Sequence, residues 1–374
     1  MNLCFVSDYY PALPTFGGIA IYTQRIARAL SERGHQVHIV VAKAGRVEDF
    51  EDDGVRVHYC DVHWIPLLGR WLPGLGESFG VARRLATLAR QHRFDLIEVP
   101  NWEGIGLAST FMLKCPVVVR LHTSLAESVE TAGRTPTQPE RFMMWSERAA
   151  TRRASAVVTH SQAHRDRMAA ACGVEAIEVI PHGVPIPPHV TPPEGRTVLS
   201  IGRMNARKGM EDLFAAIPAV FEKVPGVRFQ IVGVPPGHPA VQALLERFPD
   251  AVEALGMVTS GQLSGLYEQC AVYVSPALYE SFGLTFAEAM GHGRPVVGCR
   301  ASAVPEIVRD GVDGRLAPPR DPPAIAAALV ELLLNEDARR TMGANARARA
   351  VENFAIGKAA MRTESFFQRV AGSA

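Results

Sequence analysis

Short apolar runs alternate with amphipathic stretches along almost all of this 374-residue sequence, and this alternation limits the fold more than any other feature. Residues 3–7 form the first apolar run, and residues 20–33 follow with Tyr22, Ile26 and Leu30 on one helical face. Continuous apolar strands between helices are typical of a parallel sheet that is covered on both faces. The sequence therefore predicts an α/β protein.

The alternation is interrupted by a proline-rich stretch at residues 181–195. Prolines and glycines with few apolar residues indicate a linker, and the alternation begins again at residue 197. Because domains of about 100–200 residues are usual, we expect two Rossmann-like domains. Their predicted limits are residues 1–185, a linker at 186–195, residues 196–354, and a C-terminal helix at 355–374.

The composition is that of an ordinary globular protein, with 47% hydrophobic and 21% charged residues. A net charge of +1 gives no overall field that favours nucleic acid. Six cysteines without a C-x-x-C spacing argue against a zinc ribbon or a disulfide framework, and they are typical of reduced thiols in the cytoplasm. No apolar run is long enough for a spanning helix. Residues 64–75 either pack as a loop, which we favour, or contact the inner face of a membrane peripherally.

Two loops that follow predicted strands carry residues suited to phosphate. Ligands of open α/β sheets bind at the carboxyl ends of the strands, so two facing domains would hold a ligand in the cleft between them. Gly17 and Gly18 open a helix where the backbone can approach an anion, although a plain tight turn explains them equally well. Arg203 and Lys208 could clamp phosphates, although a solvated basic loop is an equal alternative.

Glu280 and Glu288 flank the start of a predicted helix that begins near Gly283. The backbone N–H groups of Gly283, Leu284 and Thr285 would bind a diphosphate there. Carboxylates accept hydrogen bonds from vicinal hydroxyls, so each glutamate could hold a sugar on one side of that diphosphate. The alternative is a capping acid and a surface acid, which we favour less because the helix around Glu288 is nearly apolar.

Several motifs together resemble those of the retaining glycosyltransferases with the GT-B fold, in the large family called family 4. The resemblance covers nearly the whole chain. It rests on the E-x7-E motif from Glu280 to Glu288, with Ser-Phe-Gly-Leu inside it, and on four further segments. These segments are Tyr10-Pro11 with Gly17-Gly18, Ile180-Pro181-His182-Gly183-Val184, Gly202-Arg203 with Lys208-Gly209, and Val304-Pro305-Glu306-Ile307 with Asp310-Gly311 through Gly314.

The resemblance implies a nucleoside-diphosphate sugar as donor and a role for each matching residue. Arg203 and Lys208 would hold the diphosphate. Glu280 would contact the transferred sugar, Glu288 would bind the ribose, and His122 would face the donor sugar. The implied catalytic residues are Glu280, His122, Arg203 and Lys208. The implied donor-binding residues are Gly17, Gly18, Arg203, Lys208, Met257, Val258, Phe282, Gly283, Leu284, Thr285 and Glu288.

The acceptor is expected to be a sugar, a glycolipid or a small molecule. In this family acceptors bind at strand ends of the first domain, and the candidates there are Trp102, Glu103 and Ser124. The resemblance also implies that the C-terminal helix crosses back onto the first domain.

Two positions depart from the family pattern. Pro185 stands where the junction motif usually continues with Asp, and Ser302-Ala303 stand where two glycines usually precede the Val-Pro-Glu segment. Neither departure is expected to touch the chemistry itself, but both are expected to alter the local backbone and the donor preference.

The resemblance further implies transfer with retention of configuration, through same-face substitution at the sugar. Arg203, Lys208 and the helix N-terminus would stabilise the charge on the departing diphosphate. No D-x-D motif is present, so we expect neither a metal site nor a cofactor. Two alternatives bind the same donor, namely a GT-B sugar-nucleotide epimerase or hydrolase and a non-catalytic sugar-nucleotide-binding protein. A product assay separates them.

Overall fold

The structure of the chain is a computed structural model that describes residues 1–10, 17–42, 48–60 and 74–373. Contacts divide the chain into two compact units, each with its own sheet. Unit 1 comprises Met1–Gly183 and Ile356–Ala374, and unit 2 comprises Val184–Ala355. No helix among the described residues is long and apolar enough to cross a membrane. Of the loop at residues 64–75, only the last two positions lie within the described residues.

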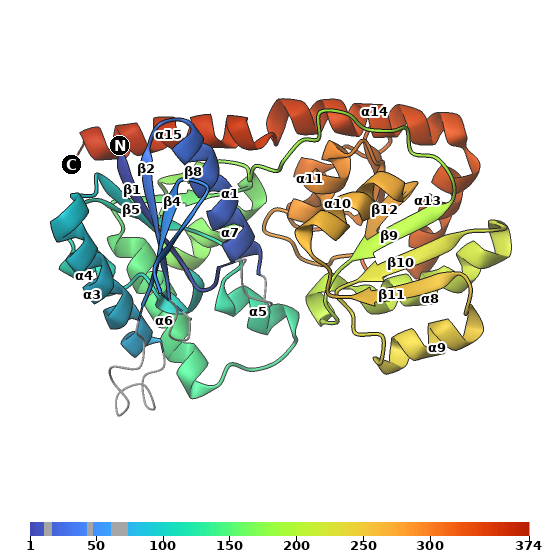
Figure 1. Cartoon of the computed structure of the whole chain (residues 1–374). Coiled ribbons are helices and arrows are strands. Elements are labelled where there is room, and N and C mark those ends of the chain that lie inside the picture. The colour runs from blue at the N-terminus through green and yellow to red at the C-terminus, as the bar shows by residue number, and fades with distance from the viewer. Residues whose placement is uncertain (11–16, 43–47, 61–73, 374) are drawn as a thin grey trace. The chain divides into compact units, whose positions relative to one another are not determined.

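Unit 1 contains an eight-stranded sheet (Figure 1). Its strands are β1 (Asn2–Ser7), β2 (Gln36–Val41), β3 (Phe50–Asp52), β4 (Val55–Tyr59), β5 (Leu96–Pro100), β6 (Val117–Arg120), β7 (Ala156–Thr159) and β8 (Ile177–Val179). They lie in the order β3-β4-β2-β1-β5-β6-β7-β8. Neighbours are parallel except β3 and β4, which form an antiparallel hairpin that the alternation of the sequence did not predict. Three residues of mixed polarity in β3 are too few to show a strand period.

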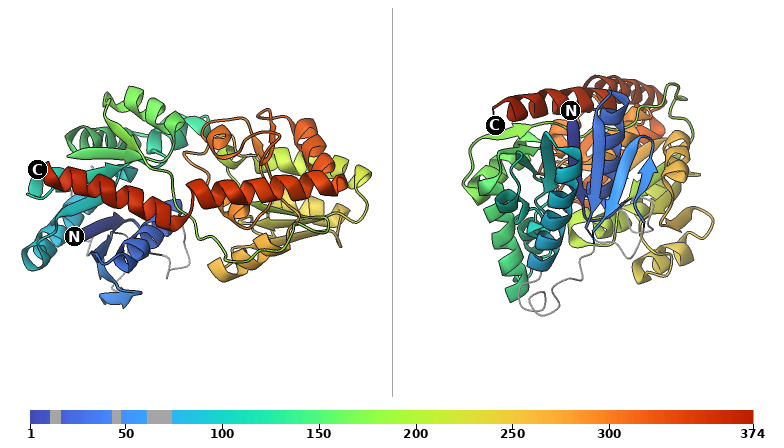
Figure 2. Two further views of the ribbon diagram at one scale, coloured as in Figure 1. Left: turned by 90° about the horizontal axis from the view of Figure 1, so that it is seen from above. Right: turned by 60° about the vertical axis from the view of Figure 1, so that its left-hand side comes forward.

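Helices cover both faces of this sheet (Figure 2). They are α1 (Gly18–Glu32), α3 (Leu75–His92), the 3-10 turn η1 (Trp102–Gly104), α4 (Ser109–Met112), α5 (Leu125–Thr131), α6 (Gln138–Arg153), α7 (Gln162–Cys172) and α15 (Ile356–Gly372). Successive side chains of a strand point to opposite faces. In β1, Leu3 and Phe5 therefore pack with α1 and α15, whereas Cys4 and Val6 pack with α3 and α7. The C-terminal helix thus completes one core of unit 1.

Unit 2 contains a six-stranded sheet whose neighbouring strands are all parallel, in the order β11-β10-β9-β12-β13-β14. The strands are β9 (Thr197–Ile201), β10 (Arg228–Val232), β11 (Val252–Gly256), β12 (Val272–Ser275), β13 (Val296–Cys299) and β14 (Gly314–Ala317). The helices are the 3-10 turn η2 (Ala206–Lys208), α8 (Met210–Lys223), α9 (Pro239–Arg247), α10 (Ser260–Gln269), α11 (Leu284–Gly291), α12 (Val304–Ile307), α13 (Pro322–Leu334) and α14 (Glu336–Asn353). Val198 packs with α8 and α13 on one face, and Leu199 packs with α11 and α14 on the other.

The proline-rich segment after residue 184 forms part of unit 2. Buried arginines hold it there, because Arg294 donates to the Thr191 carbonyl at 2.6 Å and Arg339 donates to the Pro193 carbonyl at 2.8 Å. A segment rich in proline has few N–H groups with which to join a sheet, so its backbone carbonyls accept hydrogen bonds from side chains instead. The segment is therefore anchored by side chains and contains no helix or strand.

Candidate functional site

Three polar residues of unit 2 lie beyond the carboxyl ends of three neighbouring strands. β9, β12 and β13 lie side by side, and Lys208, Glu280 and Ser302 lie in the segments that follow them. The chain leaves β9 toward β10 and β11 and then returns to its other side with β12. Ligands of open α/β sheets bind at such a point of reversal. Strand order therefore brings together three loops that are distant in the sequence.

Lys208 and Glu280 form an ion pair between Nζ and Oε1, and an Arg207 guanidinium nitrogen lies 3.5 Å from the other carboxylate oxygen. Burial raises the pKa of Glu280, but the charges of Lys208 and Arg207 outweigh burial and hold that pKa below its usual value. Burial also lowers the pKa of Lys208, and the charge of Glu280 offsets only part of this. Glu280 is therefore a carboxylate with fixed orientation at neutral pH.

Arg207 belongs to this cluster although no family motif marks it. Its carbonyl accepts hydrogen bonds from the N–H groups of Leu278 at 2.8 Å and Tyr279 at 3.3 Å. Its guanidinium donates to the Tyr279 carbonyl at 3.3 Å. Arg207 therefore ties the loop after β9 to the segment that leads into Glu280. Its place in a loop with two other cations is the sequence signal that points to it.

Gly209 permits this close approach of the two loops. It has a left-handed backbone, with φ of 61°. A Cβ atom at this position would come within 2.1 Å of the Pro276 carbonyl oxygen, which no side chain can do without moving the backbone. Glycine is therefore required both by the conformation and by the space.

Helix α11 begins at Leu284, four residues after Glu280. Its N-cap residue, Gly283, has φ of 110°, a conformation that strongly favours glycine, and it has no side chain with which to cap the first turn. The N–H groups of such a first turn lack intrahelical acceptors and bind anions. Glu288 lies within α11, is buried, and accepts a hydrogen bond from the Tyr267 hydroxyl of α10 at 2.9 Å. The two glutamates are thus placed before and within the helix, as the motif spacing predicts.

Other predicted donor residues lie at the same end of the sheet or in the core. Arg203 follows β9 and is exposed, with no ion pair or hydrogen bond of its guanidinium recorded among the described residues. Met257 follows β11 with 61% of its surface exposed, whereas the neighbouring Val258 is half-buried. Phe282 differs from expectation, because its ring is buried edge-on against Phe354. Only the backbone of Phe282 can therefore face a ligand.

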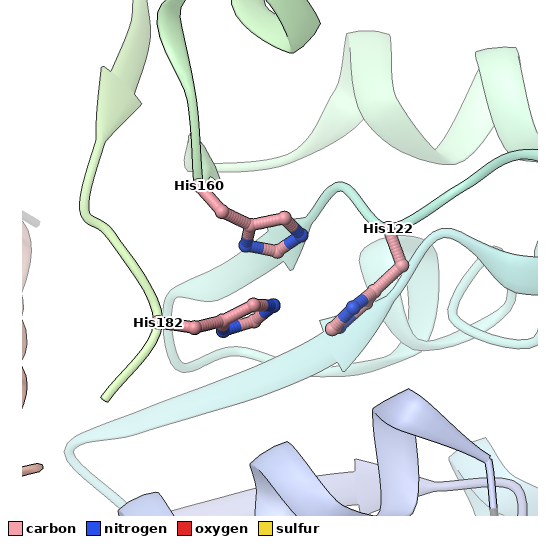
Figure 3. Close-up of side chains that lie close together, drawn as sticks. All are labelled: His122, His160 and His182. Carbon is pink, nitrogen blue, oxygen red and sulfur yellow. The ribbon is translucent and has the colours of Figure 1, made fainter. Parts of the chain in front are cut away.

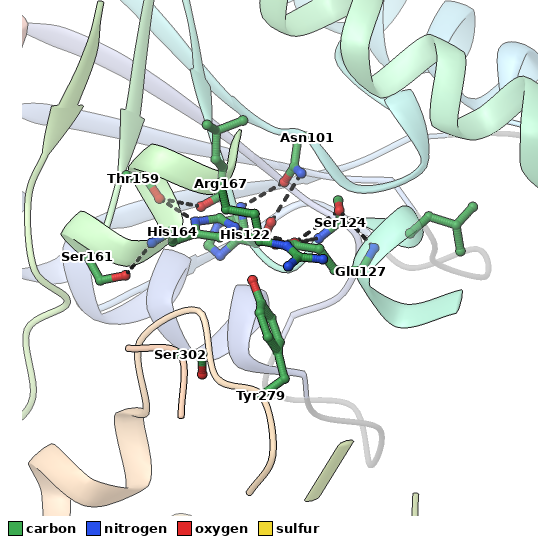
Figure 4. Close-up of polar contacts among 12 residues, drawn as sticks. Asn101, His122, Ser124, Glu127, Thr159, Ser161, His164, Arg167, Tyr279 and Ser302 are labelled. Carbon is green, nitrogen blue, oxygen red and sulfur yellow. Dashed lines mark hydrogen bonds and ion pairs between the residues drawn. The ribbon is translucent and has the colours of Figure 1, made fainter. Parts of the chain in front are cut away.

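In unit 1, His122 follows β6, which neighbours β5 in the sheet. Asn101 follows β5 and holds the His122 backbone twice (Figure 4). It accepts from the His122 N–H at 2.8 Å and donates to the His122 carbonyl at 3.1 Å. Burial, together with the charge of Arg120, keeps the pKa of His122 well below its usual value. His122 is therefore neutral at pH 7.

His122, His160 and His182 form a buried cluster in which one ring nitrogen of each lies within 4.8 Å of the other two (Figure 3). The His160 and His182 rings stack with centroids 3.7 Å apart and planes 25° apart. Burial keeps the pKa of each of the three well below its usual value. Three imidazoles that bind zinc at about 2.0–2.1 Å direct their ring edges toward one point, whereas these two rings lie face to face. The arrangement is that of stacked neutral rings.

Two of the acceptor candidates lie in η1. Trp102 is half-buried, and Glu103 has a left-handed φ of 53°. The Glu103 N–H donates to the buried Glu147 carboxyl at 2.9 Å, and the Leu125 N–H donates to the same carboxyl at 3.1 Å. Burial raises the pKa of Glu147 to about 8. One buried acid from α6 therefore positions both η1 and the start of α5.

The third acceptor candidate, Ser124, caps α5. Its hydroxyl accepts from the Glu127 N–H at 3.2 Å and donates to the Glu127 carboxylate at 3.0 Å. The Ser124 N–H donates to the same carboxylate at 2.8 Å, which completes a capping box. Ser124 is buried, and these contacts explain its presence without a ligand.

Gly17 and Gly18 lie where α1 begins. Gly17 is the N-cap residue with an extended backbone, at φ of −116°, and Gly18 is the first helical residue. Any residue can adopt this conformation at Gly17, so a tight turn does not explain the glycine. Among the described residues, a Cβ atom at Gly17 would meet nothing within 4 Å, so no described contact requires glycine there.

Two family models match the chain. The model described as Glycosyltransferase Family 4 matches residues 16–186, and the model described as Glycosyl transferases group 1 matches residues 195–335. Among curated proteins, a phosphatidyl-myo-inositol mannosyltransferase of Mycobacterium leprae is 28% identical, over 100% of this chain and 98% of its own length. An MMP alpha-(1->4)-mannosyltransferase of Mycolicibacterium hassiacum is 27% identical, over 94% and 95%.

Solved structures match over the whole chain. Sucrose-phosphate synthase of Thermosynechococcus elongatus matches with a TM-score of 0.83 and 20% identity, covering 100% of both chains. Anabaena HepE in complex with UDP and glucose matches with a TM-score of 0.75 and 22% identity, covering 98% of this chain and 99% of that one. At these identities the likeness concerns the fold.

Proposed function

Because this chain belongs to the family-4 glycosyltransferases, which have the GT-B fold, we propose that it transfers a hexose from a nucleoside-diphosphate sugar to an acceptor hydroxyl, with retention of configuration and without a metal ion. The observation that carries this proposal is the ion pair between the half-buried Lys208 and the buried Glu280, four residues before the start of α11. A cation, a carboxylate and free helix amides are the groups that a sugar diphosphate requires.

Lys208 has three N–H donors and uses one on Glu280. The other two are available for phosphate oxygens, and Arg203 adds a second, exposed cation. The first turn of α11 supplies N–H groups for the same diphosphate. Glu280 then accepts hydrogen bonds from the transferred sugar, and Glu288 accepts them from the ribose.

In the proposed reaction the bond between the anomeric carbon and the phosphate oxygen breaks, and the acceptor oxygen bonds to the same face of that carbon. The acceptor proton passes to the departing phosphate oxygen. Negative charge grows on the diphosphate as its bond breaks, and Lys208, Arg203 and the α11 amides stabilise that charge in fixed positions. His122 is neutral and can hydrogen-bond to a sugar hydroxyl without a net charge.

The similar proteins suggest which base and which sugar the donor carries. Two curated relatives are named mannosyltransferases, and Anabaena HepE was solved with UDP and glucose. We therefore propose a hexose on GDP or UDP as donor and a sugar-containing acceptor. Six free cysteines fit a cytoplasmic protein, and a lipid-linked acceptor would add contact with the membrane surface.

A thermal-shift panel of UDP-, GDP- and ADP-sugars tests donor binding. A ligand at about 100 times its dissociation constant stabilises the folded protein by roughly 2.7 kcal/mol. The stabilising donor is then incubated with candidate acceptors, and the configuration of the new linkage is read by NMR. Stabilisation by no sugar nucleotide contradicts the proposal. Donor hydrolysis or epimerisation that no acceptor alters supports the epimerase or hydrolase alternative instead.

A further inference from the structure

Ser302 contacts the residue to which we assign the transferred sugar. Its hydroxyl oxygen accepts a hydrogen bond from the Glu280 backbone N–H at 2.8 Å (its side chain is drawn in Figure 4). The next residue, Ala303, donates its N–H to the Glu280 carbonyl at 3.3 Å. Two consecutive residues after β13 thus hold the backbone of Glu280 from one side. The Ser302-Ala303 departure from the family pattern therefore contacts the backbone of Glu280 directly.

The backbone of Ser302 is strained. Its φ of 46° lies in the left-handed region, which residues other than glycine rarely adopt. Glycine, usual at this position in the family, would remove the strain but has no hydroxyl to offer. The strain is explained if the hydroxyl has a role that glycine cannot perform.

The opposite side of the same segment is held by the Lys208 loop. The Arg207 carbonyl accepts from the N–H groups of Leu278 and Tyr279, and Lys208 pairs with the Glu280 carboxylate. Glu280 is therefore fixed between the loops after β9 and β13. The Lys208 contact fixes the carboxylate, whereas the Ser302 contact fixes the peptide group from which that side chain extends.

We propose that Ser302 is a positioning residue that sets the place of the Glu280 carboxylate for the reacting sugar, an inference that rests on the function proposed above. A shift of the Glu280 peptide displaces its carboxylate from the sugar ring, and small displacements of catalytic groups lower turnover strongly. Donor binding depends mainly on the diphosphate contacts, so it changes little.

Two substitutions separate this role from a structural one. Ser302→Gly removes the hydroxyl and relieves the strain, whereas Ser302→Ala removes the hydroxyl and keeps a Cβ atom at positive φ. We expect both to lower kcat by a similar factor, roughly three- to tenfold, with little change in KM for the donor. The unfolding temperature of Ser302→Gly stays near that of the wild type, and that of Ser302→Ala falls.

The control is Arg320→Gly, which relieves a positive φ of 58° at an exposed position of unit 2 and leaves Ser302 intact. It should raise thermal stability and leave kcat unchanged. GDP-mannose and UDP-glucose are assayed in parallel. Two outcomes overturn the proposal. In the first, kcat falls only in Ser302→Ala, the variant whose unfolding temperature falls. In the second, kcat stays at the wild-type value in both variants.

Hydrogen exchange gives a second readout that needs no turnover. Because the Glu280 N–H donates to Ser302, the amide of Glu280 should exchange faster in both variants, by roughly three- to tenfold, while amides of α13 stay unchanged. Unchanged exchange at Glu280 overturns the positioning role even if neither sugar nucleotide is turned over. Failure of the wild-type enzyme on all donors, together with faster exchange in the variants, contradicts the proposed function alone.

Discussion

The hydroxyl of Tyr267 donates a hydrogen bond of 2.9 Å to the Glu288 carboxylate, and both side chains are buried. Tyr267 lies on α10 and Glu288 on α11, so the contact joins two helices that cover the same face of the unit 2 sheet. A carboxylate can accept several hydrogen bonds, and this contact fixes the position of one of its two oxygens. The contact therefore orients Glu288 toward the role that we propose for it at the ribose.

Tyr267→Phe should weaken donor binding without slowing the chemical step. The variant removes one hydrogen bond to a charged group but keeps the ring in the core. We expect KM for the donor to rise by roughly three- to tenfold while kcat stays near its wild-type value. Steady-state kinetics at saturating acceptor measures both. An equal loss of kcat would place Glu288 at the reacting sugar instead.

Glu280→Gln and Glu288→Gln should fail in different ways. A carboxylate on the transferred sugar matters more as that ring gains positive charge, so Glu280→Gln should lose mostly kcat. A carboxylate on the ribose acts nearly equally in both states, so Glu288→Gln should raise mostly KM for the donor. Inhibition by the free nucleoside diphosphate separates the two. If that inhibition were lost only in Glu280→Gln, the two roles would be reversed.

Arg203→Ala and Lys208→Ala should each weaken nucleoside-diphosphate binding by about 1.5–3 kcal/mol, the contribution of a charge-assisted hydrogen bond. Their stabilities should differ. Lys208→Ala leaves the buried Glu280 without its main partner and should lower the unfolding temperature, whereas the exposed Arg203 forms no ion pair with any described residue. Calorimetry with UDP and GDP measures the affinity, and Arg228→Ala at the opposite end of β10 is the control. Unchanged affinity in both variants would show that Arg203 and Lys208 do not bind the donor diphosphate.

Activity should survive removal of divalent metal ions. The prediction rests on the missing D-x-D motif and on the cations Lys208 and Arg203, which can neutralise a diphosphate themselves. After dialysis against EDTA, the initial rate should stay close to that of untreated enzyme. Loss of activity that manganese or magnesium restores would contradict metal independence.

Stability should fall as the pH drops below about 6.5, the usual pKa of histidine. Burial lowers the pKa of His160 in the folded protein, so the unfolded chain binds a proton more readily in this range. Each histidine that is neutral in the folded protein but protonated in the unfolded chain lowers the free energy of unfolding by about 1.4 kcal/mol for each pH unit of acidification. His160→Phe should reduce the slope of the unfolding free energy against pH by that amount between pH 6.5 and 5. An unchanged slope would mean that folded His160 is protonated.

The fold class and the family were predictable because both depend on local patterns. Alternating apolar runs indicated two α/β sheets, and the predicted GT-B fold and family 4 membership are confirmed by the matches to family models and solved structures. The spacing from Glu280 to Glu288 placed one carboxylate before α11 and the other inside it, because helix geometry fixes such short distances. The roles assigned to these residues stay predictions.

The partners of these residues were decided by the tertiary structure. Lys208 meets Glu280 across 72 positions of sequence, and Ser302 meets it across 22. No local period encodes those meetings, because they depend on the order of β9, β12 and β13 in the sheet. The sequence by itself determined which chemical groups follow the strands and how each helix begins. Only the order of the strands in the sheet decided which of these groups touch. Loops that are distant in the sequence become neighbours when the strands before them lie side by side.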